Sequence, residues 1–523
     1  MRKLTLLLVV TIVITSCSEP EKSERIQWTS SSEVAKNLFE EFLINFENYN
    51  WEPKSQEALF DSITKLDPEF YSAKIFNGFK GNEERRALLR LAYNNRSKVS
   101  DLESRLIELN YEGRIKGNIN RQDQILDSLI LDYPKYYQLY IWSGDVKNQL
   151  DVKASEKRYE EALLVNSNSF AAYVNLAFFH FPTDDSFLML ATNERDLKKA
   201  EMLLNKAKEI FPESSRPPRF LGNIYRAQSK FDKALSSYNE SLDIIEKFET
   251  GTESNQYANS LLMVGHVYTF QGQYEKARSY YDNAISISNE GWMVSINVLK
   301  SQTFLYQKNF AAAVNLLSEV QNQVSFFDLD EVQKINFTEY LEFSKFIAFG
   351  HSNQQLATQE SINKMKDLRA SRRKILLSTA QDEKEKQRIE TNFNNSNMET
   401  DIWFNILFGN YEEASVQIGK FKSMSEVELE FNPTALNSFY KFSGYLNLME
   451  GNPQESINDY SNLSKEDMTG DSYHSYFLAL AKKAVGKEDE SDQVFIELAN
   501  DNFATWQNSI IKNLAKAQIK TNL

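Results

Sequence analysis

Hydrophobic residues recur along most of this chain at intervals of three and four positions, with polar residues between them. Ala200, Leu204 and Ala207, for example, lie on one side of a predicted helix that ends before Pro212. This spacing matches the turn of an amphipathic helix, whereas a strand would alternate at every second position. Glycine (17) and proline (10) are scarce among the 523 residues. The pattern therefore predicts an all-α protein.

Small and aromatic residues return in a fixed register within these predicted helices. A small residue is followed by alanine or serine twelve residues later and by tyrosine sixteen residues later. The register is followed by Gly222, Ala234 and Tyr238; by Gly265, Ala277 and Tyr281; and by Gly444, Ser456 and Tyr460. Two helices cross closely only where side chains are small, so we expect Gly222 to face Ala234 on the next helix. Aromatic rings would then fill the gaps between neighbouring helices.

This register resembles that of the tetratricopeptide repeat, a helix–turn–helix unit of about 34 residues. The large residue followed by glycine, and the later Tyr, Ala and Tyr of the family pattern, are carried best by Leu221, Gly222, Tyr225, Ala234 and Tyr238. The resemblance implies an α-solenoid of tandem helix pairs, in which the first helices line a concave face.

The same register divides the chain into predicted parts. Repeats support an N-terminal tetratricopeptide array over residues 33–330 and a C-terminal array with a capping helix over residues 401–523. Residues 331–400 carry no clean repeat, and their charged composition predicts an irregular segment of one or two long helices. Residues 182–194 interrupt one repeat and form a candidate functional loop.

The first residues have the pattern of an exported lipoprotein. Arg2 and Lys3 precede an apolar run, 4–13, that is too short to span a bilayer. A small residue then precedes Cys17, the only cysteine of the chain. This arrangement resembles the lipobox of bacterial lipoproteins, so residues 1–16 are a predicted lipoprotein signal peptide and Cys17 a predicted lipidation site. An ordinary export signal followed by a chance cysteine is the alternative.

Lipidation would place the protein at a membrane. Acyl chains contribute about 0.8 kcal/mol for each buried methylene, which anchors a chain without making it span the bilayer. The polar residues 17–32 predict a flexible tether between the lipid and the folded body. We therefore expect a bacterial cell-envelope protein, anchored at the periplasmic face or at the outer membrane or cell surface.

The net charge and the absence of catalytic motifs argue against several classes of function. With 59 Lys and Arg against 73 Asp and Glu, the net charge of −14 argues against nucleic acid as a partner. The four histidines lack metal-ligand spacing, and neither a Gly-x-Ser-x-Gly elbow nor a phosphate-binding glycine loop is present. We therefore expect no catalytic residue, no cofactor, no metal and no enzymatic activity.

One predicted helix offers a candidate ligand-binding site. Arg216, Arg219, Asn223 and Arg226 recur at spacings of three and four, so they share one face of the first helix in the best repeat. They resemble in part the carboxylate clamp of chaperone-binding tetratricopeptide domains, which implies a protein or peptide partner with acidic groups. Met263 stands where that clamp needs another polar residue. The alternative is a solvated arginine stripe paired with neighbouring acids.

Two functions are consistent with these sequence features. The first is a cell-envelope lipoprotein that acts as a non-enzymatic protein-interaction scaffold through the concave face of a tetratricopeptide superhelix. The second is a glycan- or nutrient-binding outer-membrane lipoprotein that resembles the SusD type, which shares the anchor, the length and the helices. Such proteins hold sugar in loop-rich regions abundant in Gly, Pro and Trp. Here Gly and Pro are few and the 6 tryptophans are scattered, which favours the scaffold.

Overall fold

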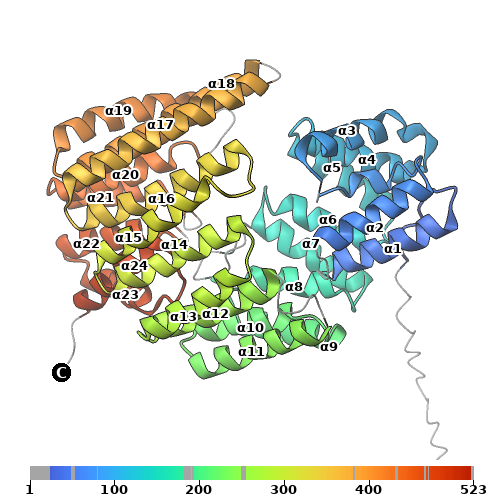
Figure 1. The fold of residues 1–523 in the computed structure, drawn as a ribbon, viewed down its shortest axis with the longest axis horizontal. Helices are drawn as coiled ribbons and strands as arrows, with labels where there is room; N and C mark the ends of the chain where they lie inside the picture. The colour runs from blue at the N-terminus through green and yellow to red at the C-terminus, as the bar shows by residue number, and fades with distance from the viewer. Residues whose placement is uncertain are drawn as a thin grey trace, which may run out of the picture. The chain divides into compact units, whose positions relative to one another are not determined.

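Helices make up every regular element that the structure, a computed structural model, describes (Figure 1). The described residues are 24–48, 53–78, 80–181, 190, 194–248, 255–380, 383–429, 434–464, 467–468 and 470–519. They contain 24 α-helices in paired packing, which confirms the predicted all-α fold of helix pairs. The expected signal peptide, Cys17 and most of the candidate loop 182–194 lie outside the described residues. No helix in the described part of the chain is long and apolar enough to cross a membrane.

The chain forms two compact units. The first ends at Ala172 and the second comprises Tyr173–Leu523. The boundary therefore does not fall in the segment 331–400, which was expected to separate two arrays. The helices of that segment bury apolar residues such as Phe346 and Met365, so they pack into the second unit like the other helices although they lack the repeat register.

The first unit consists of short helix pairs. Its helices are α1 (Glu33–Glu47), α2 (Pro53–Leu66), α3 (Asn82–Asn94), α4 (Asp101–Arg114), α5 (Ile119–Asp132), α6 (Tyr137–Lys147) and α7 (Val152–Val165), with 3-10 turns η1 (Ala73–Ile75) and η2 (Arg96–Lys98). The α1–α2, α4–α5 and α6–α7 pairs pack side by side. Ser100 and Glu103 form a capping box at the start of α4, which satisfies backbone donors that a helix leaves unpaired.

The residues just before α1 belong to the packed first unit. Ile26 and Trp28 are buried, and the Trp28 ring meets the Phe39 ring edge-on at 5.1 Å between centroids. Thr29 donates from its backbone nitrogen and its hydroxyl to the buried Glu103 carboxylate. The tether predicted for residues 17–32 is therefore wrong over 24–32, because two large apolar side chains outweigh the polar composition of the segment.

The second unit is one continuous stack of helix pairs. Its helices are α8 (Phe170–Phe178), which crosses the unit boundary, α9 (Leu197–Ile210), α10 (Arg216–Ala227), α11 (Phe231–Phe248), α12 (Asn255–Phe270), α13 (Tyr274–Ser286), α14 (Glu290–Tyr306), α15 (Phe310–Val324), α16 (Glu331–His351), α17 (Gln355–Thr379), α18 (Glu383–Leu407), α19 (Tyr411–Glu428), α20 (Asn437–Met449), α21 (Pro453–Tyr460), α22 (Ser472–Ala484), α23 (Glu488–Asn500) and α24 (Trp506–Gln518). Each helix from α9 to α24 packs against the next, and first helices of successive pairs, such as α18, α20 and α22, also contact one another.

The end of this stack returns to its own earlier part. Helix α24 packs against α22 and α23, as a cap would, and also against α14 and α16 (Figure 1). The Tyr306 hydroxyl on α14 donates to Asn508 Oδ1 at 2.8 Å, and the Asn513 amide donates to the Tyr306 carbonyl at 3.0 Å. The second unit is therefore closed on itself, and the inner faces of α14 and α16 are covered by α24.

Tyrosine rings pack against the small residues of the register. A Cβ added at Gly222 would lie 2.3 Å from the Tyr238 ring, and one at Gly265 would lie 2.5 Å from the Tyr281 ring. That Gly222 faces Ala234 stays a prediction, and the atoms nearest to such a Cβ belong to the ring of Tyr238 on the same helix, α11. Ala234 is itself fully buried, so both small positions permit close packing of the pair.

Candidate functional site

The second unit holds a cavity of about 630 Å³, here called the central cavity, where the end of the stack meets its beginning. Its wall is formed by the residues before α9, by α10, by the α21–α22 connection, by α22 and α23, and by the residues before α24. The charged residues in the wall are Arg195, Arg226, Asp471, Glu497 and Asp501. A cavity of this volume is in the range that small molecules and short peptide segments occupy in proteins.

The four predicted site residues all lie on α10, but they do not share one open surface. Asn223 and Arg226 line the central cavity, whereas Arg216 and Arg219 are not part of its wall. The exposed fractions of Arg219 and Arg226 are only 5% and 3%. Arg219 donates to Gln256 on α12 at 2.7 Å. The alternative of a solvated arginine stripe is therefore wrong for Arg219 and Arg226, because neighbouring helices cover them. Arg216 is partly exposed, and a ligand-binding role of the four residues stays a prediction.

Asn223 has a partner inside its own helix pair. Its Oδ1 accepts a hydrogen bond from the Tyr238 hydroxyl at 2.7 Å. The equivalent residue one repeat later, His266, places Nδ1 2.8 Å from the Tyr281 hydroxyl. The residue after the register glycine thus holds the tyrosine that packs on that glycine, and the carbonyl oxygen of Asn223 serves packing.

Arg226 is the candidate residue with unused hydrogen-bonding capacity. Its Nη1 contacts the Met263 sulfur at 3.3 Å, while its Nε is buried and has no hydrogen-bond partner. Its backbone carbonyl accepts from the Asn502 amide at 3.0 Å, which ties α10 to the residues before α24. Burial and the nearby Arg226 charge hold the pKa of His266 well below its usual value, so that imidazole is neutral.

Two further residues of the wall were not found from the sequence. Arg195, before α9, donates from Nε to the Leu190 carbonyl at 2.8 Å, and its Nη2 is buried without a partner. Burial lowers the pKa of this guanidinium group. Ser472, the first residue of α22, is 7% exposed, and its Oγ also lacks a partner. These residues stand far from Arg226 in the sequence, and no motif connects them.

Two of the three carboxylates in the wall of the central cavity, Asp471 and Asp501, have nearby cations. Asp471 pairs with Lys441 at 2.9 Å; burial favours a higher pKa for Asp471, but His474 and Lys441 hold that pKa below its usual value. Burial raises the pKa of Asp501, against the opposing effects of Asn508 and Lys512. Lys512 donates to the Asp501 carbonyl and, at 3.2 Å, to Asn502 Oδ1, and its burial lowers its pKa to about 8.

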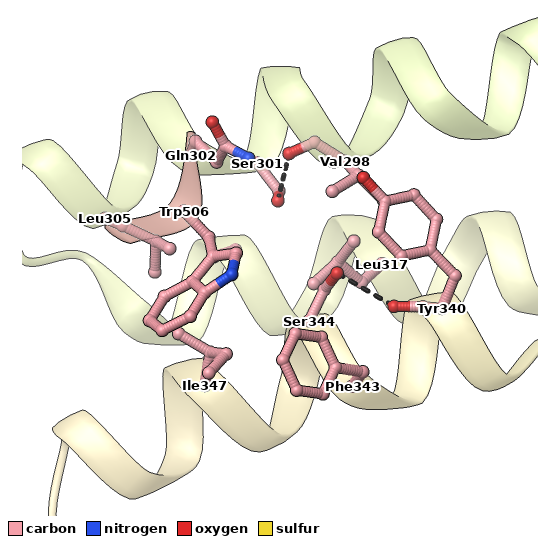
Figure 2. A pocket seen from close by; sticks show the side chains of 11 residues that line it. Val298, Ser301, Gln302, Leu305, Leu317, Tyr340, Phe343, Ser344, Ile347 and Trp506 are labelled. Carbon is pink, nitrogen blue, oxygen red and sulfur yellow. Dashed lines mark hydrogen bonds between the residues drawn. The ribbon is translucent and has the colours of Figure 1, made fainter. Parts of the chain in front are cut away.

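A second, much smaller cavity lies at the junction of α14, α15, α16 and α24 (Figure 2). Trp506, Phe343, Leu305 and Leu317 are among the side chains that line a volume of about 20 Å³, and Figure 2 shows Trp506 beside Leu305. That volume admits about one water molecule. Gln302 Oε1, which is buried without a partner, lies at its edge. This junction is a packing contact of α24, and the central cavity is the better candidate site.

In the described residues, no group of three or more His, Cys, Asp or Glu is placed to hold a metal ion.

Comparison with known proteins identifies the repeats. Residues 213–290, which include α10 to α13, match the family model described as tetratricopeptide repeat. None of the curated proteins matches this chain.

Several solved structures resemble parts of the chain. A tetratricopeptide repeat protein from Parabacteroides merdae is 13% identical, with a TM-score of 0.35, over 51% of this chain and 93% of that one. MamA is 16% identical, with a TM-score of 0.27, over 34% of this chain and 92% of that one. YrrB, described as a TPR protein with an unusual peptide-binding site, is 17% identical, with a TM-score of 0.24, over 40% of this chain and 91% of that one. These scores are low, so the similarity to the tetratricopeptide repeat family is shown for residues 213–290 alone.

Proposed function

We propose that this chain, whose residues 213–290 match the tetratricopeptide repeat family, is a lipid-anchored scaffold of the bacterial cell envelope, which binds a partner protein and catalyses no reaction. The observation that carries the binding proposal is the central cavity, about 630 Å³ in volume and lined by charged, polar and apolar side chains. A helix stack made only for mechanical support would gain stability by filling such a space, because cavities in a packed protein cost free energy.

The proposed anchor is supported by the N-terminal sequence. Arg2 and Lys3, the apolar run 4–13 and the sole cysteine, Cys17, stand in the order of a lipoprotein signal. Acylation at Cys17 would bind the mature chain to a membrane while leaving the helix stack in water. The envelope location is therefore part of the proposal.

The position of α24 indicates where on the stack a partner would bind. Tetratricopeptide stacks bind extended peptides or helices on their inner face. In the second unit α24 already covers the inner faces of α14 and α16. We therefore place the binding segment of the partner at the central cavity, beside α10 and α22, where the wall includes Asn223 and Arg226.

A cavity-filling variant tests the proposal. Ala227→Trp adds an indole ring to the wall of the central cavity at the last residue of α10. Ala312→Trp on α15, another partly exposed alanine that is not part of the wall, is the matched control. Each lipidated protein is crosslinked in cells and the captured envelope proteins are identified by mass spectrometry. We expect the parent and Ala312→Trp to capture the same partner and Ala227→Trp to lose it.

The outcome distinguishes this function from glycan binding. Capture of the same partner by Ala227→Trp, with unfolding curves like those of the parent, would show that the central cavity is not the partner site. A glycan array run in parallel addresses the nutrient-binding alternative. Glycan binding that disappears in Ala227→Trp, without any captured protein, would replace the scaffold by a sugar-binding lipoprotein.

A further inference from the structure

We infer that the first unit rests on the surface of a lipid bilayer through one edge. This edge, here called the leucine edge, consists of Leu131, Tyr133, Lys135, Tyr136 and Leu164. The inference rests on the proposed function, because the bilayer is the one in which an acylated Cys17 would be anchored. It adds to the anchor a second contact, which is made by side chains of the folded chain.

Two leucines are exposed at this edge. Leu131 on α5 and Leu164 on α7 are 82% and 87% exposed. Each is the penultimate residue of its helix and stands two positions after a fully buried residue, Leu129 in α5 and Ala162 in α7. Removing such apolar side chains from water is favourable, so a surface that covers both leucines gains free energy.

The equivalent positions of the second unit are polar. In α9, α11 and α13 the corresponding fully buried residues are Ala207, Ser241 and Ala284. The exposed residues two positions later are Glu209, Asp243 and Ser286. Packing of the helix pairs therefore does not require an apolar residue at this position. The leucines of α5 and α7 serve an interaction that these helices of the second unit do not make.

Both leucines lie at the same edge of the first unit. Helix α6 packs against α5 and against α7, and short connections join the three helices. Neighbours joined in this way are antiparallel, so α5 and α7 run in the same direction and end at the same edge. The α5–α6 connection adds Tyr133 and Tyr136, whose ring centroids are 6.1 Å apart. Tyrosine is enriched at membrane–water interfaces, because its ring is apolar and its hydroxyl is polar.

The chain enters the first unit beside this edge. Glu24 pairs with Lys135 in the α5–α6 connection at 3.6 Å. Arg25 donates to the hydroxyl of Tyr137, the first residue of α6, at 3.1 Å. Glu24 is the seventh residue after Cys17, so even a fully extended chain holds this connection at most about 25 Å from the acylated residue. The edge that carries the exposed leucines is therefore the one that the anchor draws to the bilayer.

The charges beside the leucines are compatible with a lipid surface. Asp132, next to Leu131, pairs with Arg105 at 2.7 Å, and Glu161, on the same helix as Leu164, pairs with Arg158. Cationic partners thus reduce the repulsion between these carboxylates and lipid phosphates. The net charge of the chain, −14, argues against a strongly anionic bilayer. Zwitterionic lipids are therefore the appropriate probe.

Fluorescence from a single labelled position tests the inference. Cys17 is the sole cysteine and acylation would block its thiol, so Leu131→Cys supplies the only labelling site. The lipidated full chain is labelled with nitrobenzoxadiazole and incorporated into vesicles of phosphatidylcholine and phosphatidylethanolamine. We expect emission at shorter wavelength, and loss of fluorescence when the lipids carry a nitroxide near the head group. Leu356→Cys on α17 is the matched control, because Leu356 is 83% exposed but belongs to the second unit. Its label should show neither change.

A charged substitution tests whether the two leucines act together. Glutamate stands at the equivalent position of α9, so Leu164→Glu is compatible with a folded helix pair. In the chain labelled at Leu131→Cys, Leu164→Glu should shift the equilibrium about tenfold away from the seated unit, because burial of one leucine is lost. Quenching by the nitroxide lipids then falls. Leu356→Glu in the same labelled chain should leave the quenching unchanged.

The outcomes separate the inference from the proposed function. Flotation with the vesicles reports the anchor alone. If the lipidated chain floats but the labels of Leu131→Cys and Leu356→Cys behave alike, the inference is overturned and the anchored scaffold stands. A spectral shift of the Leu131→Cys label without vesicles would assign the edge to a second copy of the chain and overturn the inference as well. A chain that does not float would overturn both the anchor and the contact that depends on it.

Discussion

Single residues set how closely the helix pairs of the second unit pack. A methyl group at Gly222 would lie 2.3 Å from the Tyr238 ring, and this ring is fully buried. Gly222→Ala therefore forces the ring or its helix to move. We expect a loss of about 1–3 kcal/mol in the free energy of unfolding, as is usual for overpacked cores. Thermal and urea unfolding followed by circular dichroism measure this loss.

A second glycine provides the control for this prediction. Gly419 lies within α19, and a Cβ there would meet nothing within 4 Å. Gly419→Ala removes only the conformational freedom of the unfolded chain, so it should be neutral or stabilise by up to about 1 kcal/mol. Similar losses in both variants would mean that Tyr238 does not pack against Gly222 as the structure shows.

His266 gives the second unit a specific sensitivity to acid. Burial and the charge of Arg226 hold its pKa well below the usual value, and its Nδ1 lies 2.8 Å from the Tyr281 hydroxyl. Below about pH 6.5 the unfolded chain takes up a proton at this imidazole and the folded chain does not. The unfolded state then binds more protons, so stability falls as the pH falls, with a limiting slope of about 1.4 kcal/mol per pH unit.

His266→Asn isolates this contribution, because Asn223 holds Tyr238 in the same way one repeat earlier. The variant keeps an acceptor for the Tyr281 hydroxyl but cannot titrate. We expect urea unfolding at pH 7.5 and pH 5 to show a smaller loss for His266→Asn than for the parent. An equal loss in the two proteins would indicate that His266 is protonated in the folded state.

At the scale of helices, the sequence patterns predicted which segments form helices better than they predicted which residues of those helices meet. The spacing of Ala200, Leu204 and Ala207 predicts a helix ending before Pro212, and α9 (Leu197–Ile210) confirms it. The glycine–tyrosine register predicts close pairs, and the ring of Tyr238 lies nearest to Gly222. Sequence spacing reports which face of a helix is buried, but the rotamers of the opposing side chains decide which atoms meet there.

The candidate site shows the same limit of prediction for residues that are far apart in the sequence. The three- and four-residue spacing placed Asn223 and Arg226 on one face, and both line the central cavity. Ser472 and Asn502 reach that cavity only because the end of the stack packs back on its beginning, whereas Arg195 precedes α9, which packs directly on α10. Closure depends on small rotations accumulated over many helix pairs, so no local pattern encodes it. Arg226, for which the sequence predicted exposure, is buried and contacts Met263 on the neighbouring helix α12.

At the scale of the whole molecule, the two units differ in how regular they are. The repeat register is clearest at residues 213–290, the part of the second unit that matches the family model. In the first unit, Ile26 and Trp28 add non-repeat packing before α1. The described packing thus begins shortly after Cys17. A lipid at Cys17 would therefore hold the first unit close to the membrane surface, because only a few residues separate the two.

The proposed anchor predicts how the whole protein partitions between membrane and water. In Cys17→Ser no acyl chain can be attached, and the chain loses the roughly 0.8 kcal/mol that each buried methylene contributes to membrane binding. After fractionation of an envelope from cells that lipidate exported proteins, we expect the parent in the membrane pellet and Cys17→Ser in the soluble fraction.

Ser18→Ala is the control, because it keeps the cysteine. This variant should remain with the membrane and incorporate labelled palmitate. The unfolding curves of all three should coincide, because Ile26 and Trp28 are the first core residues of the described chain. Retention of Cys17→Ser in the pellet would show that the membrane affinity comes from another part of the protein.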